Sequence, residues 1–139
     1  MSASSAEGEP ASVVSLKVCH PGSADVVPRF RHAAVDFAAA NGADAALCDD
    51  VALAVSEAVT NAVKHADARE DETVSMTASV ADDWLEICVI DRGAGFGNPE
   101  SDGLGLGLSI IARLSANLTI SQEGRGTELI MRFPLPRRG

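Results

Sequence analysis

The most informative segment of this chain reads Glu57-Ala58-Val59-Thr60-Asn61-Ala62-Val63-Lys64-His65. It belongs to a longer segment, residues 45–66, in which apolar residues recur at helical spacing. Residues four apart lie about 40° apart around a helix. Glu57, Asn61 and His65 are therefore predicted to form one polar ridge beside the apolar stripe. Such a ridge can line a cleft, although the same spacing is typical of an ordinary exposed polar face.

Two side chains on this ridge have suitable chemistry for a nucleotide site. Asn61 offers a neutral amide oxygen, which suits a hard cation such as Mg²⁺ that is held mainly by phosphates and waters. Glu57, one turn earlier, could take a proton from an attacking hydroxyl or water.

A first glycine-containing stretch follows an apolar segment that is predicted to be a strand. Asp91 stands where that strand ends, and Gly93 and Gly95 come directly after it. A carboxylate there could accept a hydrogen bond from an exocyclic amine, and the glycines would let a planar base approach the backbone. An ordinary turn after a strand is the alternative interpretation.

A second stretch, Gly103-Leu104-Gly105-Leu106-Gly107-Leu108, leads into a predicted helix. Alternating glycines allow backbone N–H groups to converge on an anion at the start of a helix. The stretch is neither the phosphate loop nor the dinucleotide turn of other nucleotide-binding folds. A flexible hinge is the alternative, although a mere linker would not need the intervening leucines.

Later in the chain, Thr127 follows the turn Gly124-Arg125-Gly126. Its hydroxyl could contact a ligand or a buried water, although a purely structural hairpin turn is the simpler interpretation.

The hydrophobic pattern predicts a strand at 13–19, helices at 26–41 and 45–66, strands at 73–80 and 84–90, a helix at 106–116, and hairpin strands at 118–122 and 127–133. Residues 23–25 are expected to cap the first helix and Asp44 the second, with Asn41-Gly42 between them. The nearly continuous apolar run at 84–90 indicates a central strand.

This order predicts an α+β fold, a two-layer α/β sandwich with a mixed, mostly antiparallel sheet under three helices. Residues 1–12 are expected to be a disordered tail, residues 13–133 one domain, and residues 134–139 a basic tail.

Composition narrows the possible functions. The chain has 139 residues, enough for one domain, and a net charge of −9. That charge makes nucleic acid or an anionic membrane surface a poor partner, and no apolar run approaches the ~20 residues of a membrane span. The odd cysteine count, without metal-type spacing or a signal peptide, indicates a reducing cytoplasm and buried free thiols at Cys19, Cys48 and Cys88.

Taken together, the motifs occur in an order that resembles the GHKL (Bergerat-type, histidine-kinase-like) ATPase superfamily over residues 13–133. Glu57 and Asn61 match the N box of that superfamily, and Asp91, Gly93 and Gly95 match its first glycine box. The second glycine box is matched by Gly103, Gly105 and Gly107, and the last motif by Gly126 and Thr127. Residues 55–62 are most similar to the bacterial anti-sigma-factor serine/threonine kinases.

The resemblance implies ATP and Mg²⁺ as cofactors and a protein kinase activity. Asn61 would hold Mg²⁺ between the ATP phosphates, Asp91 would contact the adenine amino group, and Glu57 would act as general base toward a serine of an anti-anti-sigma protein. The remaining nucleotide contacts would come from Lys64, His65, Gly93, Gly95, Gly103, Leu104, Gly105, Leu106, Gly107, Leu108 and Thr127. The chain would also sequester a sigma factor as a homodimer.

One departure from the family pattern leaves the catalytic rate open. The lid between the glycine boxes, residues 97–102, is short and contains no Lys or Arg. The nearest cations are Arg92 and Arg113, with Lys64 and Arg125 as possible substitutes at the γ-phosphate. Two alternative functions remain. The first is a nucleotide-dependent binding module with little catalysis. The second is a histidine-kinase catalytic module with His20 or His32 as the phosphate acceptor, although lone histidines are usually structural or solvated.

Overall fold

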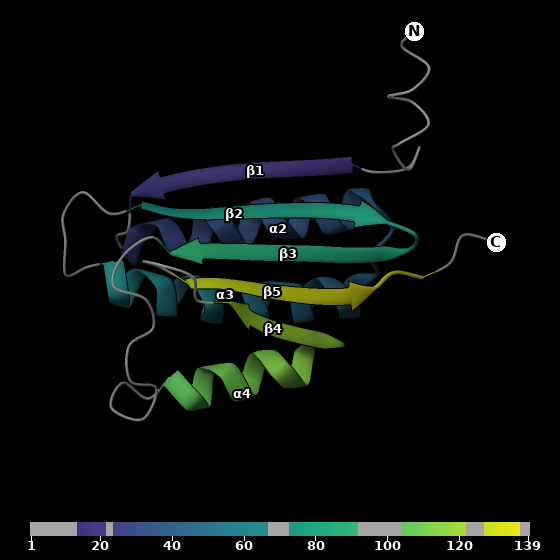
Figure 1. Ribbon diagram of the computed structural model, residues 1–139. Coiled ribbons are helices and arrows are strands. Elements are labelled where there is room, and N and C mark those ends of the chain that lie inside the picture. The colour runs from purple at the N-terminus through teal and green to yellow at the C-terminus, as the bar shows by residue number, and fades with distance from the viewer. Residues whose placement is uncertain (1–13, 22–23, 67–72, 92–103, 122–126, 137–139) are drawn as a thin grey trace, which may run out of the picture.

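The computed structural model describes residues 14–21, 24–66, 73–91, 104–121 and 127–136. Five strands, β1 (Val14–Pro21), β2 (Thr73–Ala81), β3 (Trp84–Asp91), β4 (Asn117–Ser121) and β5 (Thr127–Pro134), form one sheet in the order β1-β2-β3-β5-β4. Three α-helices, α2 (Val27–Ala40), α3 (Ala45–Ala66) and α4 (Leu104–Leu114), and a short 3₁₀ turn, η1 (Ala24–Val26), complete the described elements. Figure 1 shows the sheet in front of α2 and α3, with α4 beside β4. The α+β sandwich expected from the sequence is confirmed.

All the ladders between the described strands are antiparallel, which corrects the expectation of a mixed sheet. The central position predicted for residues 84–90 is confirmed, because β3 pairs with both β2 and β5. The β2–β3 turn, also expected, is formed by Asp82 and Asp83 with φ of 55° and 65°. Short polar side chains tolerate this left-handed conformation better than most.

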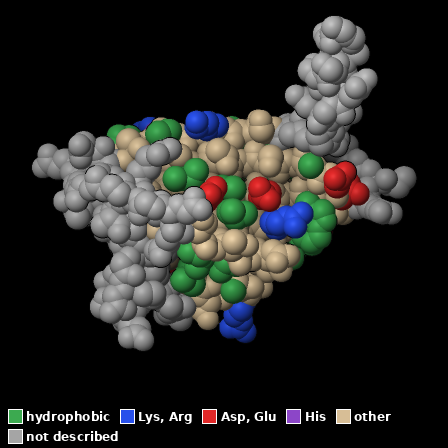
Figure 2. Space-filling model, in the orientation of Figure 1, with side chains coloured by type: hydrophobic (Ala, Val, Ile, Leu, Met, Phe, Trp, Pro, Cys, Tyr) green, Lys and Arg blue, Asp and Glu red, His purple; other side chains and the backbone are tan. Residues whose placement is uncertain are grey.

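The core lies between the sheet and the helices. Alternate residues of β3 and β5, among them Leu85, Ile87, Met131 and Phe133, are fully buried on the face toward the helices. Side chains of α3 meet them at Val51, Val55, Ala58, Val59 and Ala62. The opposite face of the sheet is open, and Figure 2 shows apolar, acidic and basic side chains interspersed over it. On that face the Arg132 guanidinium lies 4.7 Å from the Trp84 ring centroid, and its Nε lies 3.7 Å from Glu86 Oε1.

The helix ends were predicted with mixed success. Asn41 and Gly42 end α2 as expected, with Gly42 at φ 103° and the Ala43 amide donating to the Ala38 carbonyl. The cap expected from residues 23–25 is wrong: Val26 is the N-cap, without a side-chain cap hydrogen bond, after a 3₁₀ turn and before Pro28. Proline in a first helical turn needs no N–H and presets φ, so the helix begins without a polar cap.

The end of β1 and the end of the packed chain both differ from the sequence prediction. β1 runs through Pro21, where the sequence predicted a break, because an edge strand has a free side on which a missing N–H is harmless. The packed chain also continues to Leu135, which is buried and donates its amide to the Asp83 carbonyl. Residues 134 and 135 therefore do not belong to the basic tail predicted at 134–139. Residues 137–139, the tail predicted at 1–12 and the hairpin turn at 123–126 lie outside the described residues.

The cysteines correct a smaller prediction. Cys19 is exposed, Cys48 is intermediate and only Cys88 is buried; all three are free thiols. Burial raises the pKa of the Cys88 thiol to about 11, so this thiol is protonated and unreactive at neutral pH.

The cap of α3 gives a stability prediction. Asp44 Oδ1 accepts a hydrogen bond from the Leu47 amide at 2.9 Å, as the sequence predicted. Asp44→Ala leaves that amide without its partner, so we expect the free energy of unfolding to fall by about 0.5–2 kcal/mol. Urea unfolding checks this, with Asp49→Ala, an exposed position of the same helix, as the control. An equal loss in both variants would show that the cap adds nothing.

Candidate functional site

The predicted site residues converge on one end of the sandwich. Asn61 lies in the C-terminal half of α3, Asp91 ends β3, and Thr127 begins β5. Asp91 and Thr127 are cross-strand partners in the β3–β5 ladder. Figure 1 shows that the last turns of α3, the end of β3 and the starts of β5 and α4 all lie at the left end of the view. Sequence-distant motifs are therefore brought together by the topology.

The ridge on α3 winds from the exposed surface into the fold. Glu57 is half-buried, whereas Asn61, one turn later, is only 6% exposed. The cause is geometric: each four-residue step turns the ridge by about 40° toward the apolar stripe. Glu57 is thus accessible from solvent while Asn61 faces inward. The interpretation of this spacing as an ordinary exposed polar face is wrong for Asn61.

The Asn61 side-chain nitrogen is unusual among the described residues. This atom, Nδ2, is buried and has no hydrogen-bond partner among the described residues. Buried polar atoms are normally paired, and an orphaned one costs about 1–3 kcal/mol. An orphaned amide at this end of the molecule fits a polar ligand, and so it fits the nucleotide and metal that the sequence motifs imply.

Asp91 and Thr127 are two further buried polar residues at this end. They are 1% and 3% exposed, and both take part in polar interactions. Their side chains share the helix-facing side of the sheet with the apolar residues of β3 and β5. A carboxylate that ends the central strand at the edge of the core is suitably placed to accept a hydrogen bond from a planar base.

The second glycine stretch differs from its prediction. Helix α4 begins at Leu104, two residues earlier than expected, so Gly105 and Gly107 belong to its first turn. The first four amides of a helix have no partner within it. Counted from the N-cap residue before Leu104, the free amides that belong to α4 are those of residues 104–106, so the repeat itself supplies N–H groups at the positive end of the helix dipole. The half-buried Leu108 packs against the core, which argues against a mere hinge.

Several predicted site residues cannot be placed. Gly93, Gly95, Gly103 and Gly126 lie outside the described residues, as do the short lid at 97–102 and the cations Arg92 and Arg125. The backbone of Lys64 and His65 belongs to α3, but their side chains are outside the described part. Arg113 is exposed in the last turn of α4, about 13 Å along the helix from its start by helical rise.

The two histidines considered as phosphate acceptors lie in different environments. The half-buried His20 ring packs edge-on against Phe30 with 5.2 Å between centroids, whereas His32 is exposed on α2. Among the described residues there is no group of three His, Cys, Asp or Glu side chains positioned to share a metal ion.

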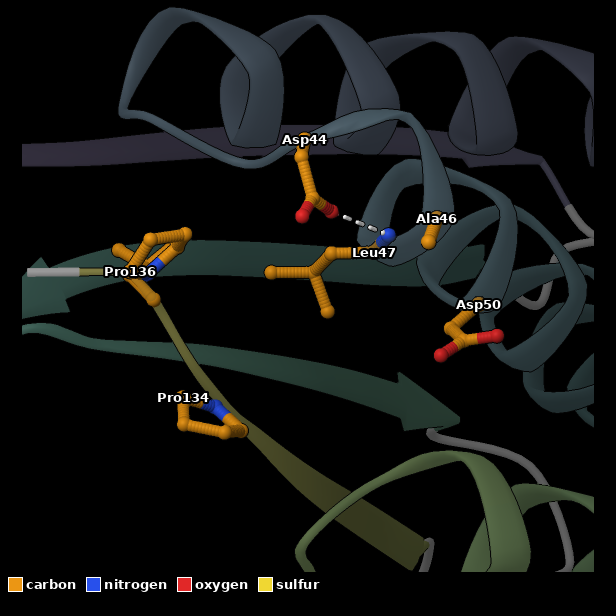
Figure 3. A pocket seen from close by; sticks show the side chains of 7 residues that line it. Asp44, Ala46, Leu47, Asp50, Pro134 and Pro136 are labelled. Atoms are coloured by element: carbon orange, nitrogen blue, oxygen red, sulfur yellow. Dashed lines mark hydrogen bonds between the residues drawn. The ribbon is translucent and has the colours of Figure 1, made fainter.

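The sequence did not predict a groove that the structure shows in the described part of the molecule. A groove of about 420 Å³ lies at the opposite end, between the start of α3 and the end of β5. Figure 3 shows the side chains of Asp44, which precedes α3, and of Asp50 on α3, with the rings of Pro134 and Pro136 across from them and Leu47 between. A smaller hollow of about 170 Å³ lies beside Trp84 and Arg132 on the open sheet face. Neither hollow belongs to the Asn61 end.

None of the described helices is both long and apolar enough to cross a membrane.

Comparison with known proteins identifies the family. Residues 21–133 match the family model described as the histidine kinase-like ATPase domain. The chain is 34% identical over 97 residues to an anti-sigma F factor of Clostridium acetobutylicum, covering 60% of this chain and 68% of that protein. It is 33% identical over 97 residues to the sensor histidine kinase PdtaS of Mycobacterium tuberculosis, but this covers only 19% of PdtaS.

A solved structure shares the fold. The crystal structure of the RsbU and RsbW domains of Rv1364c from Mycobacterium tuberculosis aligns with a TM-score of 0.70 at 23% identity, over 88% of this chain and 32% of that longer chain. The family match and the fold agree with each other. This chain belongs to the histidine kinase-like ATPase family.

Proposed function

We propose that this protein is an ATP-binding anti-sigma factor that phosphorylates a serine of an anti-anti-sigma protein and so regulates transcription by partner switching. The observation that carries the proposal is the pairing on α3 of a buried Asn61, with its orphaned Nδ2, and an accessible Glu57 one turn away. Membership of the ATPase family and the similarity to anti-sigma F factors support it.

The nucleotide would lie with its base at Asp91 and its phosphates toward α4. Asp91 accepts the hydrogen bond of the adenine amino group, and Thr127, its cross-strand partner, contributes its hydroxyl beside it. The amides of residues 104–106 bind phosphate oxygens at the positive end of α4. Asn61 contributes an amide oxygen to Mg²⁺, and Lys64 and His65 follow on the same helix. Bound Mg-ATP supplies the phosphoryl group and neutralises part of its charge.

Glu57 then acts on the protein substrate. Its carboxylate would accept the proton of the serine hydroxyl as that oxygen bonds to the γ-phosphorus of ATP and ADP leaves. The half-exposed position of Glu57 lets a second protein reach it. Phosphoryl transfer depends mainly on positioning and charge. We also propose that the protein works in the cytoplasm as a homodimer, and that it contacts a sigma factor rather than nucleic acid, since its net charge is −9.

The direct test incubates the protein with labelled ATP, Mg²⁺ and its cognate anti-anti-sigma protein. We expect label on the partner in an acid-stable form, because phosphoserine survives acid and phosphohistidine does not. Acid-labile label would indicate the histidine-kinase alternative. ATP binding without any transfer would remove the kinase activity.

The second candidate is a nucleotide-dependent binding regulator with little or no catalysis. The lid at 97–102, which contains no Lys or Arg, favours it, because charge at the γ-phosphate is then harder to neutralise. If the protein is only a binding regulator, its Glu57→Ala variant should bind the partner as well as the parent does. If the protein is a kinase, the variant should lose phosphoryl transfer.

Adenine recognition gives a further prediction. Asp91→Asn keeps the shape of the side chain but replaces one carboxylate acceptor by a donor, so the hydrogen bond from the adenine amine is weakened. We expect the Kd for ATP to rise about tenfold, the effect of losing one hydrogen bond to a charged group. Calorimetric titration with ATP and GTP measures this, and the preference for ATP should shrink. Unchanged discrimination between the two nucleotides would show that Asp91 does not read the base.

A further inference from the structure

An exposed leucine lies one helical turn before Glu57. Leu53 is 47% exposed, and Ile120 on β4, 42% exposed, is the other large apolar residue left open among the described residues. Positions 53 and 57 differ by about 40° around α3, so both side chains point to the same outer side of the helix. Leu53 stays open although α3 packs against both α2 and α4. Single exposed leucines are common, and position is what distinguishes this one.

The same side of α3 leads to the acidic groove. Asp50 lies one turn before Leu53 and lines the groove together with Asp44, opposite Pro134 and Pro136. Asp50, Leu53 and Glu57 fall within about 60° of one another around the helix and span about 10 Å of its axis. We call these three residues and the groove the docking track. Along α3 it consists of the groove, which is lined by both acidic and apolar residues, then the exposed Leu53 side chain, then the carboxylate of Glu57.

We propose that the docking track binds the anti-anti-sigma protein and so delivers its serine to Glu57. This rests on the proposed function, since Glu57 lies one helical turn after Leu53, so that a protein bound to Leu53 and the groove would hold a serine close to the carboxylate. The matching surface of the partner carries an apolar side chain for Leu53 and a Lys or Arg whose stem lies on Leu47 and the prolines, with its charge near Asp50. Leu53 is a specificity-determining contact and Asp50 steers association; neither touches the phosphates.

The test compares Leu53→Asp with Ile120→Asp in steady-state transfer to the anti-anti-sigma protein at saturating ATP. Ile120 is matched in size and exposure but belongs to β4. We expect Leu53→Asp to raise the KM for the protein substrate at least about tenfold, the effect of losing one central anchor. Its kcat and its Kd for ATP should stay as in the parent, and Ile120→Asp should behave like the parent. Asp50→Asn should raise KM less and make it less sensitive to salt.

The outcomes separate this inference from the proposed kinase. If the parent transfers phosphate but Leu53→Asp keeps its KM, or Ile120→Asp raises KM equally, the docking track is wrong and the kinase stands. If the parent binds the anti-anti-sigma protein without transfer, the kinase is wrong, and the Kd values of the same variants decide the track. A loss of sigma-factor binding in Leu53→Asp with normal transfer would assign the track to the other partner and overturn the proposal.

Discussion

Asn61→Ala is expected to weaken binding of Mg-ATP about 100-fold, which is at the upper end of the loss seen when a contact that supports a bound metal is removed. The amide is 6% exposed and its Nδ2 has no partner among the described residues, so the fold gains little from it. Removing a buried polar group that is unsatisfied also relieves a desolvation cost. We therefore expect the melting temperature of the variant without ligand to be at least that of the parent.

Calorimetric titration with ATP in the presence and absence of Mg²⁺ separates the two parts of this prediction. If Asn61 acts through the metal, parent and variant should differ much less when Mg²⁺ is absent. Thr60→Ala is a suitable control, because Thr60 is adjacent but half-exposed. A variant that melts at a lower temperature and binds Mg-ATP normally would make Asn61 a structural residue and remove the site.

Local signals in the sequence predicted the elements well where they agreed with one another. The bounds of α3 are those expected, because Asp44 caps its start and its apolar stripe is long and regular. The nearly continuous apolar run of β3 correctly predicted that this strand lies in the middle of the sheet. The start of α4 was missed because glycines discourage a helix locally, and here packing of Leu108 and Ile111 against the core overrides that preference.

Other features depend on contacts between distant segments and could not be predicted. Whether strands pair in parallel or antiparallel is decided by how the helices cross the sheet, and the alternation within one strand carries no information on it. The burial of Asn61 has the same origin. Its position on the ridge was clear from spacing, but whether that ridge faces solvent or the sheet depends on how α3 is rotated against β3 and β5. The groove beside Pro134 likewise joins residues about 90 positions apart in sequence.

Glu57→Ala is expected to lower phosphoryl transfer to the anti-anti-sigma protein by about 10²–10⁴-fold, the usual contribution of a general base. Glu57 is half-exposed and lies one turn before Asn61, so its carboxylate can meet an incoming serine while Asn61 faces the nucleotide. Because Glu57 touches the attacking hydroxyl and not ATP, the Kd for Mg-ATP should hardly change. The loss should appear in kcat rather than in KM for the protein substrate.

Glu86→Ala is the matched control for this experiment. Glu86 is also a half-buried glutamate, but it lies on the open sheet face and pairs with Arg132 at 3.7 Å, so its removal should not affect transfer. Rapid-quench measurement of a single turnover isolates the chemical step from product release. Glu57→Gln should be as slow as Glu57→Ala, since the amide keeps the size of the side chain but accepts no proton. If Glu57→Gln retained most of the rate, the carboxylate would be a positioning group, and the base would have to be sought elsewhere.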